Sequence, residues 1–507
     1  MKTLKLLTLT IAAAIASSCC STKPADEFGY LYKDLPFEME RISRPVIPSY
    51  TVDLTDFGAV GDGVTLNTEA FAKAMKHLSD KGGGHLNVPA GVWLSGPITI
   101  LSNIDLHVTR DAIILFDPNR DLYPVIETVF EGLDTKRCES PINADGAKNI
   151  SITGGGVIDG AGDAWRPLKK SKVSQPYWDK KVAGGGIATE TMWYPDEGYL
   201  IGQKGAIMNV PTADVDLNSI KSFLRPVLLS LRNCENVLLE DCLFQNSPCW
   251  GLHPLMCKNV ILKNVTVRNP EYSQNGDGID VDSCENVIIV DSVFDCGDDG
   301  LCIKSGKDAD GRRRARPCKN LLIDGCTVYH GHGGFVVGSE MSGGVHNIKV
   351  SNCRFLGTDV GLRFKSNRGR GGVVDGIYIN DIYMTDIVTQ CILFNLYYNG
   401  SNAADRVIDG QVVKGTDIPM PVDETTPAFR DIHIRNVVCN GADQAMLFKG
   451  LPEMPVKGIE IDGCTITAKR GIELSWSEDV VLRNTNVVST EGEPLTLHQV
   501  KNFKNNE

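Results

Sequence analysis

The chain is long and acidic: 507 residues carry a formal net charge of −12, and 22% of them are charged. Its length would allow two or three ordinary domains, but a repeat protein can extend a single core without splitting it. Because an acidic surface repels polyanions, the composition argues against nucleic-acid binding by general electrostatics.

The N-terminus has the pattern of a secretory signal. Lys2 and Lys5 precede an apolar run that is too short for a stable membrane-spanning helix. The following ASSC resembles a bacterial lipoprotein cleavage box, which predicts a signal peptide over residues 1–19 and lipidation at Cys19. Residues 20–48 would then be a tether for a periplasmic or outer-membrane-anchored lipoprotein that touches the membrane only through its lipid. Ordinary secretion with cleavage nearby is the alternative.

Residues 49–118 are predicted to form an entry module that closes one end of the fold. A helix is expected from about Thr68 to Lys81, because apolar residues recur there at helical spacing after a capping residue, either Asn67 or Thr68. A stack of repeats needs such a cap at its end.

The body of the chain, residues 119–490, has the pattern of a solenoid. Residues 160–222 interrupt the pattern and are expected to form a long excursion, and residues 491–507 a C-terminal tail. Elsewhere short β-rich runs alternate with Gly, Asn and Asp, and a weak repeat such as CENVLLEDC carries one asparagine per copy, at Asn236, Asn259, Asn286, Asn320 and Asn347. This predicts an all-β coil in which equivalent residues stack.

Fourteen cysteines follow Cys19 and Cys20, and their positions indicate core packing rather than disulfides. Cys234, Cys257 and Cys284 occupy the same place in successive repeats, two residues before the repeated asparagine. Free cysteine is a compact core residue, so stacked thiols inside the coil are the simpler account. No pair has CxxC zinc spacing, and we expect no metal and no cofactor.

Four short polar motifs lie about one repeat apart in the middle of this region. They are NGD at 275–277, GDD at 297–299, GHG at 331–333 and RFK at 363–365. If each repeat forms one coil, neighbouring coils lie about 4.8 Å apart and the motifs stack in one column. This column is a candidate active site.

The acids of the column fit hydrolytic chemistry. Asp277 would face Asp298 and Asp299 on the next coil, and mutual repulsion should raise the pKa of at least one of the three carboxyls. A protonated carboxyl beside a carboxylate is the pair that glycoside hydrolysis requires.

Three basic residues complete the column. His332 could hydrogen-bond the acid and tune its proton affinity. Arg363 and Lys365 would hold a negatively charged group of the substrate. Acid chemistry beside a cationic clamp indicates a uronic acid polymer as substrate.

Each motif alone has a simpler explanation. The NGDGIDVD segment has several oxygen ligands for calcium but lacks the glutamate that ends an EF-hand loop, GDDG is an ordinary turn, and GHG is often a turn with an exposed histidine. A solenoid can also serve as a non-catalytic binding stalk. The joint placement of the motifs in one column favours catalysis.

The four motifs resemble, in order and spacing, the signatures of family 28 glycoside hydrolases, the polygalacturonases. The resemblance extends to DFGAVGDG at 56–63, GGGVIDG at 154–160 and NSPCWGLHP at 246–254, and so spans most of residues 50–400. It implies a right-handed parallel β-helix, with the predicted helix as its N-terminal cap. It also implies hydrolysis of the α-1,4 linkages of galacturonan, a pectic polysaccharide, with inversion.

The resemblance also implies roles for individual residues. The catalytic set comprises the general acid Asp298, the water-activating Asp277 and Asp299, and the supporting His332. The substrate-binding set comprises Asn275, Arg363, Lys365 and a tyrosine of the next coil, for which Tyr398 fits better than Tyr397.

Two features separate this chain from fungal endo-acting members. NGD replaces their usual NTD, which matters little because the middle residue carries no proton. The entry module, the insertion and the SNRGRGG after Lys365 are similar to exo-acting bacterial members, in which extra loops can close one end of a groove. We therefore expect an exo-polygalacturonase. An endo-polygalacturonase and a rhamnogalacturonan-directed hydrolase are alternatives, with a calcium-dependent pectate lyase further behind.

Overall fold

The computed structural model describes residues 26–398, 406–408 and 411–506, so the predicted signal peptide and the lipidation at Cys19 lie outside the described residues. The chain divides into two units, Met1–Leu35 and Pro36–Glu507. The described part of the first holds one 3-10 helix, η1 (Gly29–Tyr32). The second holds all other elements. None of the helices in the described ranges is both long and apolar enough to cross a membrane.

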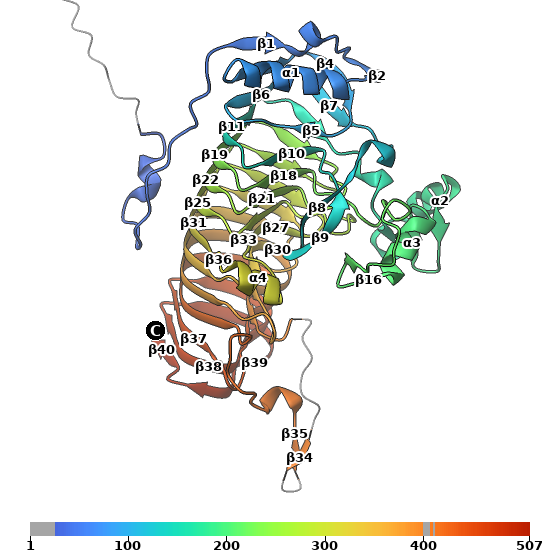
Figure 1. Ribbon diagram of the computed structural model, residues 1–507. Coiled ribbons are helices and arrows are strands. Elements are labelled where there is room, and N and C mark those ends of the chain that lie inside the picture. Colours follow the sequence, from blue (N-terminus) through green and yellow to red (C-terminus); the bar gives the residue numbers. More distant parts are fainter. Residues whose placement is uncertain (1–25, 399–405, 409–410, 507) are drawn as a thin grey trace, which may run out of the picture. The chain divides into compact units, whose positions relative to one another are not determined.

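The second unit is a parallel β-helix, as expected, in which successive coils stack on three faces (Figure 1). The first face comprises β1 (Thr51–Asp53), β3 (Gly84–Val88), β6 (Ile104–Val108), β11 (Lys148–Thr153), β19 (Glu235–Glu240), β22 (Lys258–Lys263), β25 (Glu285–Val290) and β28 (Cys318–Asp324). The second face comprises β2 (Asp62–Leu66), β4 (Gly91–Ser95), β7 (Ala112–Phe116), β12 (Val157–Asp159), β20 (Leu243–Gln245), β23 (Thr266–Arg268), β26 (Val293–Cys296) and β29 (Thr327–His330). The third face comprises β5 (Ile98–Thr99), β10 (Ile142–Asp145), β18 (Leu229–Arg232), β21 (Leu252–Leu255), β24 (Ile279–Asp282), β27 (Asp299–Lys304), β30 (Gly333–Gly338) and β32 (Leu362–Lys365).

Longer strands continue the stack towards the C-terminus. They are β31 (Val345–Leu356), β33 (Val373–Asn395), β36 (Ala428–Lys449), β37 (Val456–Asp462), β38 (Thr465–Arg483), β39 (Asn486–Lys501) and β40 (Lys504–Asn506). Both β39 and β40 pair in parallel with β38, so the prediction of a tail over 491–507 was wrong. Side chains of β39 are mostly exposed, so its sequence lacks the apolar pattern of a buried coil, although its backbone is paired.

The repeated asparagines form a hydrogen-bonded ladder. The Nδ2 of each donates to the Oδ1 of the one before, at 3.0 Å for Asn259 to Asn236, 3.2 Å for Asn286 to Asn259 and 3.1 Å for Asn320 to Asn286. These residues have φ from 57° to 61°, in the left-handed region that asparagine tolerates better than most residues. The sequence repeat therefore marks the same turn in every coil.

The interior of the coils is apolar and capped at its N-terminal end by α1 (Thr68–Asp80) (Figure 1). Phe71, Ala74, Met75 and Leu78 of this helix are buried in the same cluster as the coil interior, which confirms the predicted cap. The fourteen cysteines among the described residues are all buried and free, as the stacked-thiol hypothesis requires.

Several segments leave the coils (Figure 1). One is the antiparallel hairpin formed by β8 (Val125–Phe130) and β9 (Leu133–Cys138), and another holds α4 (Asp308–Arg314). The stretch between β12 and β18, where an excursion was expected, holds α2 (Gln175–Ala183), α3 (Glu197–Lys204), β13 (Leu168–Lys169), β14 (Ile187–Ala188), β15 (Met192–Tyr194), β16 (Ala206–Ile207) and β17 (Val210–Pro211). A fourth segment forms the hairpin β34 (Arg406–Ile408) and β35 (Gln411–Val413).

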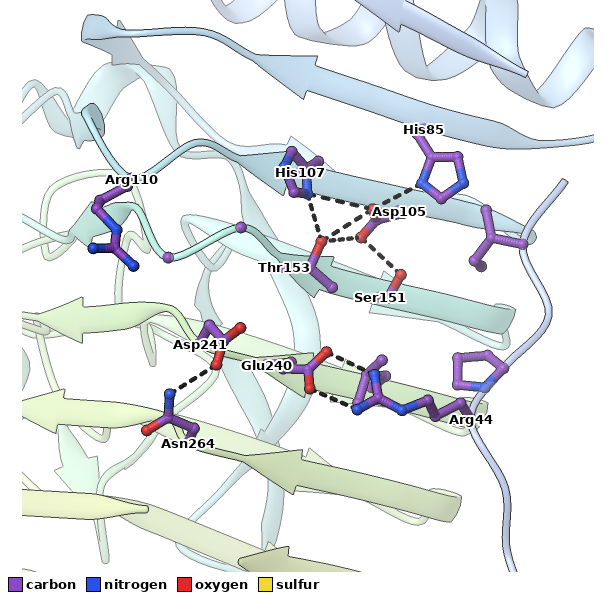
Figure 2. A pocket seen from close by; sticks show the side chains of 15 residues that line it. Arg44, His85, Asp105, His107, Arg110, Ser151, Thr153, Glu240, Asp241 and Asn264 are labelled. Carbon is purple, nitrogen blue, oxygen red and sulfur yellow. Dashed lines mark hydrogen bonds and ion pairs between the residues drawn. The ribbon is translucent and has the colours of Figure 1, made fainter. Parts of the chain in front are cut away.

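The first face carries an open polar cavity of about 780 Å³ (Figure 2). Its central residue is Asp105 on β6, which accepts a hydrogen bond from His85 Nδ1 at 2.9 Å. The same carboxylate accepts bonds from the hydroxyls of Ser151 at 2.8 Å and Thr153 at 3.0 Å on β11. Asp105 is therefore buried with its oxygens satisfied.

Residues 36–48 also lie against the first face. Arg44 donates two 2.6 Å hydrogen bonds to Glu240 on β19, and the ring of Phe37 lies 6.1 Å from that of Tyr378 on β33. The predicted tether is thus wrong for its second half, because these charged and aromatic side chains find partners on the coils.

Candidate active site

Two successive coils of the third face bring the acidic motifs together. Asp277 lies just before β24 and Asp299 begins β27, and the parallel register pairs Ile279 with Leu301. As a result, oxygen atoms of Asp277, Asp298 and Asp299 all lie within 4.8 Å of one another. The acids therefore stack in the column that the motif spacing predicts.

Asp299 is held as a carboxylate by two cations from β32. Its Oδ2 accepts a 2.6 Å hydrogen bond from Lys365 Nζ, and its Oδ1 accepts one from Arg363 at 3.2 Å. Burial opposes ionisation, but the charges of Lys365 and Arg363 outweigh it and hold the pKa of Asp299 below its usual value. The cations expected to bind substrate thus neutralise an acid of the column, although Lys365 keeps two further N–H donors.

Asp277 has the opposite environment. It is 3% exposed, and its Oδ1 has no hydrogen-bond partner among the described residues. Burial first, and then the neighbouring charges of Asp298 and Asp280, raise the pKa of Asp277 well above its usual value. Two adjacent acids of one column are therefore pushed towards different protonation states, as the repulsion argument anticipates.

Asp298 is the acid of the three that is partly exposed to the cavity. His332 Nδ1 lies 3.0 Å from Asp298 Oδ1, and its Nε2 lies 3.9 Å from Asp359 Oδ2. The hydrogen bond to Asp298 raises the pKa of His332. The histidine therefore sits where it can orient Asp298 and respond to its charge.

Tyr398, rather than Tyr397, completes the column. The Tyr398 ring lies 4.9 Å from Lys365 Nζ and 5.5 Å from the Arg363 guanidinium, which is the range of cation–π contacts. Tyr397 instead donates to a main-chain carbonyl at 2.8 Å and lies beside Arg368.

Asn275 is fixed by a residue that the motifs do not reveal. Its Oδ1 accepts a 3.0 Å hydrogen bond from Arg225, which also donates to the carbonyls of Pro248 and Gln274. Arg225 is buried and precedes β18. It orients Asn275, whose side chain lines the cavity.

The acids open into a cavity of about 260 Å³. Its walls combine residues of the column with residues from outside the coils. The lining residues are Glu131, Trp250, Asn275, Asp277, Asp298, Asp299, Lys304, Lys307, Ser339, Glu340, Lys365, Arg370 and Tyr398. A small polar cavity with several charges of each sign fits a charged sugar better than an apolar ligand.

Sequence reasoning missed a second group of charged residues beside the acids, which comprises Lys304, Glu340 and Asp280. Lys304 Nζ donates to Glu340 Oε2 at 2.9 Å and lies 3.5 Å from Asp280 Oδ1. Burial raises the pKa of Asp280 to about 8, partly offset by Lys304. The available signal was a charge at the end of an apolar strand, as in LCIKSG and GFVVGSE, which is costly unless it is paired.

The three aspartates are also the group, within the described residues, whose oxygens could surround one metal ion. Carboxylates suit calcium or magnesium, but calcium takes about six to eight oxygen ligands. Both oxygens of Asp299 are already bonded to cations. This donor set fits a metal poorly, and the metal-free column stays a prediction.

Comparison with known proteins agrees with this geometry. The family model described as glycosyl hydrolases family 28 matches residues 216–468. The solved structure of a hyperthermoactive exopolygalacturonase from Thermotoga maritima is 32% identical, with a TM-score of 0.72 over 89% of this chain and 95% of that one. The chain belongs to glycosyl hydrolases family 28.

Relatives within family 28 differ in their named mode of action. The exo-poly-alpha-D-galacturonosidase of Dickeya chrysanthemi is 29% identical over 69% of this chain and 58% of its own length. The endo-polygalacturonase of Pectobacterium carotovorum is 27% identical over 67% of this chain and 75% of its own length. Membership of family 28 makes the chain a glycoside hydrolase. It does not distinguish exo from endo action, which depends on the segments that line the cavity.

Proposed function

We propose that this family 28 enzyme is an exo-polygalacturonase, which hydrolyses α-1,4-galacturonosyl linkages of pectic galacturonan from a chain end. The observation that carries the proposal is the acidic column, with its cations, opening into a cavity that is walled by segments from outside the coils. Exo-acting relatives in Thermotoga maritima and Dickeya chrysanthemi support the same assignment.

In the proposed reaction Asp298 protonates the glycosidic oxygen, because it is the acid that reaches into the cavity and has His332 beside it. Asp277, once ionised, is more basic than Asp299 and takes a proton from water. Asp299 accepts a hydrogen bond from the same water and so orients it. The reactive form therefore needs the proton on Asp298, and interacting carboxyls share such a proton between them.

The stereochemical course follows from how Asp299 is held. The acids lie closer together than the roughly 6.5–9.5 Å typical of inverting enzymes, since their oxygens are within 4.8 Å. However, each oxygen of Asp299 is bonded to a cation, which makes it a poor nucleophile for a covalent intermediate. We therefore expect inversion, and proton NMR of the first-formed product anomer tests it.

The exo mode rests on a wall assembled from three segments. Gly132, at the tip of the β8–β9 hairpin, accepts a hydrogen bond from the main-chain N–H of Lys307 at 3.2 Å. Arg313 and Arg314 of α4 donate to Asp134 of the hairpin at 2.7 and 2.8 Å. These bonds hold the hairpin and α4 together, so that they can block one end of the cavity and prevent a polymer from extending past it.

A third segment joins this wall from the loop after β32. Arg312 of α4 donates to the carbonyl of Gly369 at 2.7 Å, and Arg370 pairs with Asp308. The wall therefore connects segments that are far apart in the sequence, and several of its residues line the cavity.

The deciding experiment is a product time course on polygalacturonic acid with EDTA present. We expect monogalacturonate or digalacturonate from the first time point, without absorbance from unsaturated ends. A ladder of intermediate sizes would instead assign an endo enzyme, and loss of activity with EDTA together with unsaturated products would assign a lyase. Cleavage of rhamnogalacturonan alone would keep the column and change the substrate.

A further inference from the structure

One buried cation of the cavity is weakly paired. Lys365 has a carboxylate partner at 2.6 Å and Lys304 one at 2.9 Å. Lys307 Nζ has its nearest carboxylate, Glu131 Oε2, at 3.7 Å, beyond hydrogen-bonding distance. Its side chain is only 9% exposed, so an ammonium with three donors faces the cavity with little compensation.

A main-chain contact with the hairpin fixes the backbone of Lys307 at the cavity wall. The N–H of Lys307 donates to Gly132, and a Cβ on Gly132 would come within 2.6 Å of that nitrogen. Gly132 has a φ of 75°, which favours glycine. The hairpin tip can therefore approach Lys307 closely only because this position is glycine.

Glu131 lies beside it on the same wall. One oxygen, Oε2, accepts a 3.0 Å hydrogen bond from Asn209, which belongs to the excursion between β12 and β18. Its other oxygen is not used in that bond, and Glu131 also lines the cavity. The wall thus presents an ammonium and a carboxylate oxygen side by side.

We propose that Lys307 and Glu131 recognise the terminal sugar of the galacturonan chain, with Lys307 binding its free carboxylate and Glu131 accepting a bond from one of its hydroxyls. This inference rests on the proposed exo mode and adds a specificity to it. A methyl ester removes the negative charge that Lys307 needs, so a chain whose terminal uronate is esterified binds poorly.

The test compares wild type with Lys307→Met on trigalacturonate. A charge-assisted hydrogen bond that is lost should raise KM by about 10- to 100-fold and change kcat less. Lys307→Arg, which keeps the charge, should recover part of the loss. Lys319→Met is the matched control, because Lys319 pairs with Glu285 at 3.3 Å on the first face, outside the cavity.

A second readout separates recognition from a structural role. Trigalacturonates esterified at only one end are compared with the free trimer, using each end in turn. Wild type should discriminate against one of these isomers by at least about tenfold, and Lys307→Met should lose that discrimination. Retained discrimination in Lys307→Met, or none in wild type, would overturn the inference.

The inference and the exo mode fail in different ways. If wild type gives a ladder of oligomers from polygalacturonate, the exo mode falls and the inference falls with it. If wild type releases only short products while Lys307→Met keeps the wild-type KM and ester preference, the inference alone falls. Should Lys307→Met fail to fold, Glu131→Gln supplies the test, since it should raise KM about tenfold while keeping ester discrimination.

Discussion

Two buried aspartates on different faces of the same β-helix make an instructive pair. Asp105, on the first face, is 3% exposed and accepts hydrogen bonds from His85, Ser151 and Thr153 (Figure 2). Asp277, beside the third face, is also 3% exposed but faces other acids and has an oxygen without a partner. Burial alone therefore does not distinguish a structural acid from the acid that we propose to be reactive. The neighbours do, because a buried polar group without a partner is retained where chemistry uses it.

The largest effect is expected at the reactive end of the comparison. Asp298→Asn removes the proposed proton donor, so kcat on polygalacturonate should fall by about 10²- to 10⁴-fold. Thermal unfolding should change little, because Asp298 is partly exposed and its loss relieves repulsion. Initial rates and a melting curve measure both, and a large fall in Tm would assign Asp298 a structural role instead.

Replacing Asp277 and Asp105 by asparagine, each in a separate variant, gives the most direct contrast. Asp277→Asn should lower kcat by about 10²- to 10³-fold and leave the free energy of unfolding nearly unchanged. Asp105→Asn should do the reverse, with kcat unchanged and stability reduced by about 1–3 kcal/mol, because three donors lose their anionic acceptor. Urea unfolding and initial rates on both variants test this, and equal behaviour of the two variants would remove the distinction.

Lys365→Met should break the pairing that makes Asp299 an exception among the three acids. Because the pKa of Asp299 is depressed, the ion pair stabilises the protein above the unfolded pKa of about 3.9 and is lost as pH falls through the lower folded value. The stability loss should therefore be about 3–5 kcal/mol at pH 7 and shrink below pH 4. Lys457→Met, at the exposed Lys457–Glu478 pair, should leave stability unchanged, and a pH-independent loss in Lys365→Met would contradict the assignment.

The smallest effect is expected from a pair of matched histidines. His332 and His330 each have Nδ1 close to an aspartate, at 3.0 Å from Asp298 and 2.9 Å from Asp295. His332→Ala should lower kcat/KM about tenfold, because Asp298 loses the hydrogen bond that orients it.

The effect of removing His332 should also depend on pH. Because the His332 pKa is raised, its protonated form and the stability it brings are present below about pH 6.5 and are lost as pH rises through the higher folded value. The difference in kcat/KM between wild type and His332→Ala should therefore be larger at pH 5 than at pH 9. His330→Ala should leave kcat/KM unchanged, and equal losses in both variants would show that His332 has no special place.

The sequence was most informative where structure repeats. The asparagine spacing predicts the coils, and the four motifs predict which acids meet, because in a β-helix residues one period apart are neighbours. The cap at α1 follows from local periodicity and capping alone. By contrast, the last coil was missed, since β39 pairs its backbone but buries few side chains.

The walls of the cavity could not be predicted for a different reason. Glu131 and Lys307 meet across 176 residues of sequence through a hairpin tip, and neither belongs to a repeat or a motif. Likewise, the sequence placed Arg363 and Lys365 beside the acids but could not say that both bond Asp299. Such contacts depend on loop conformation, which no periodicity constrains.

The asparagine ladder has a consequence for how such an enzyme can change. Successive rungs are separated by 23, 27 and 34 residues, yet the bonds between them stay between 3.0 and 3.2 Å. Additional residues are thus accommodated outside the ladder, in segments such as the one that carries α4. The coils therefore form a constant scaffold that accepts loops of different length. The reach of the enzyme along its polymer can then be altered by loop length while the acids keep their spacing.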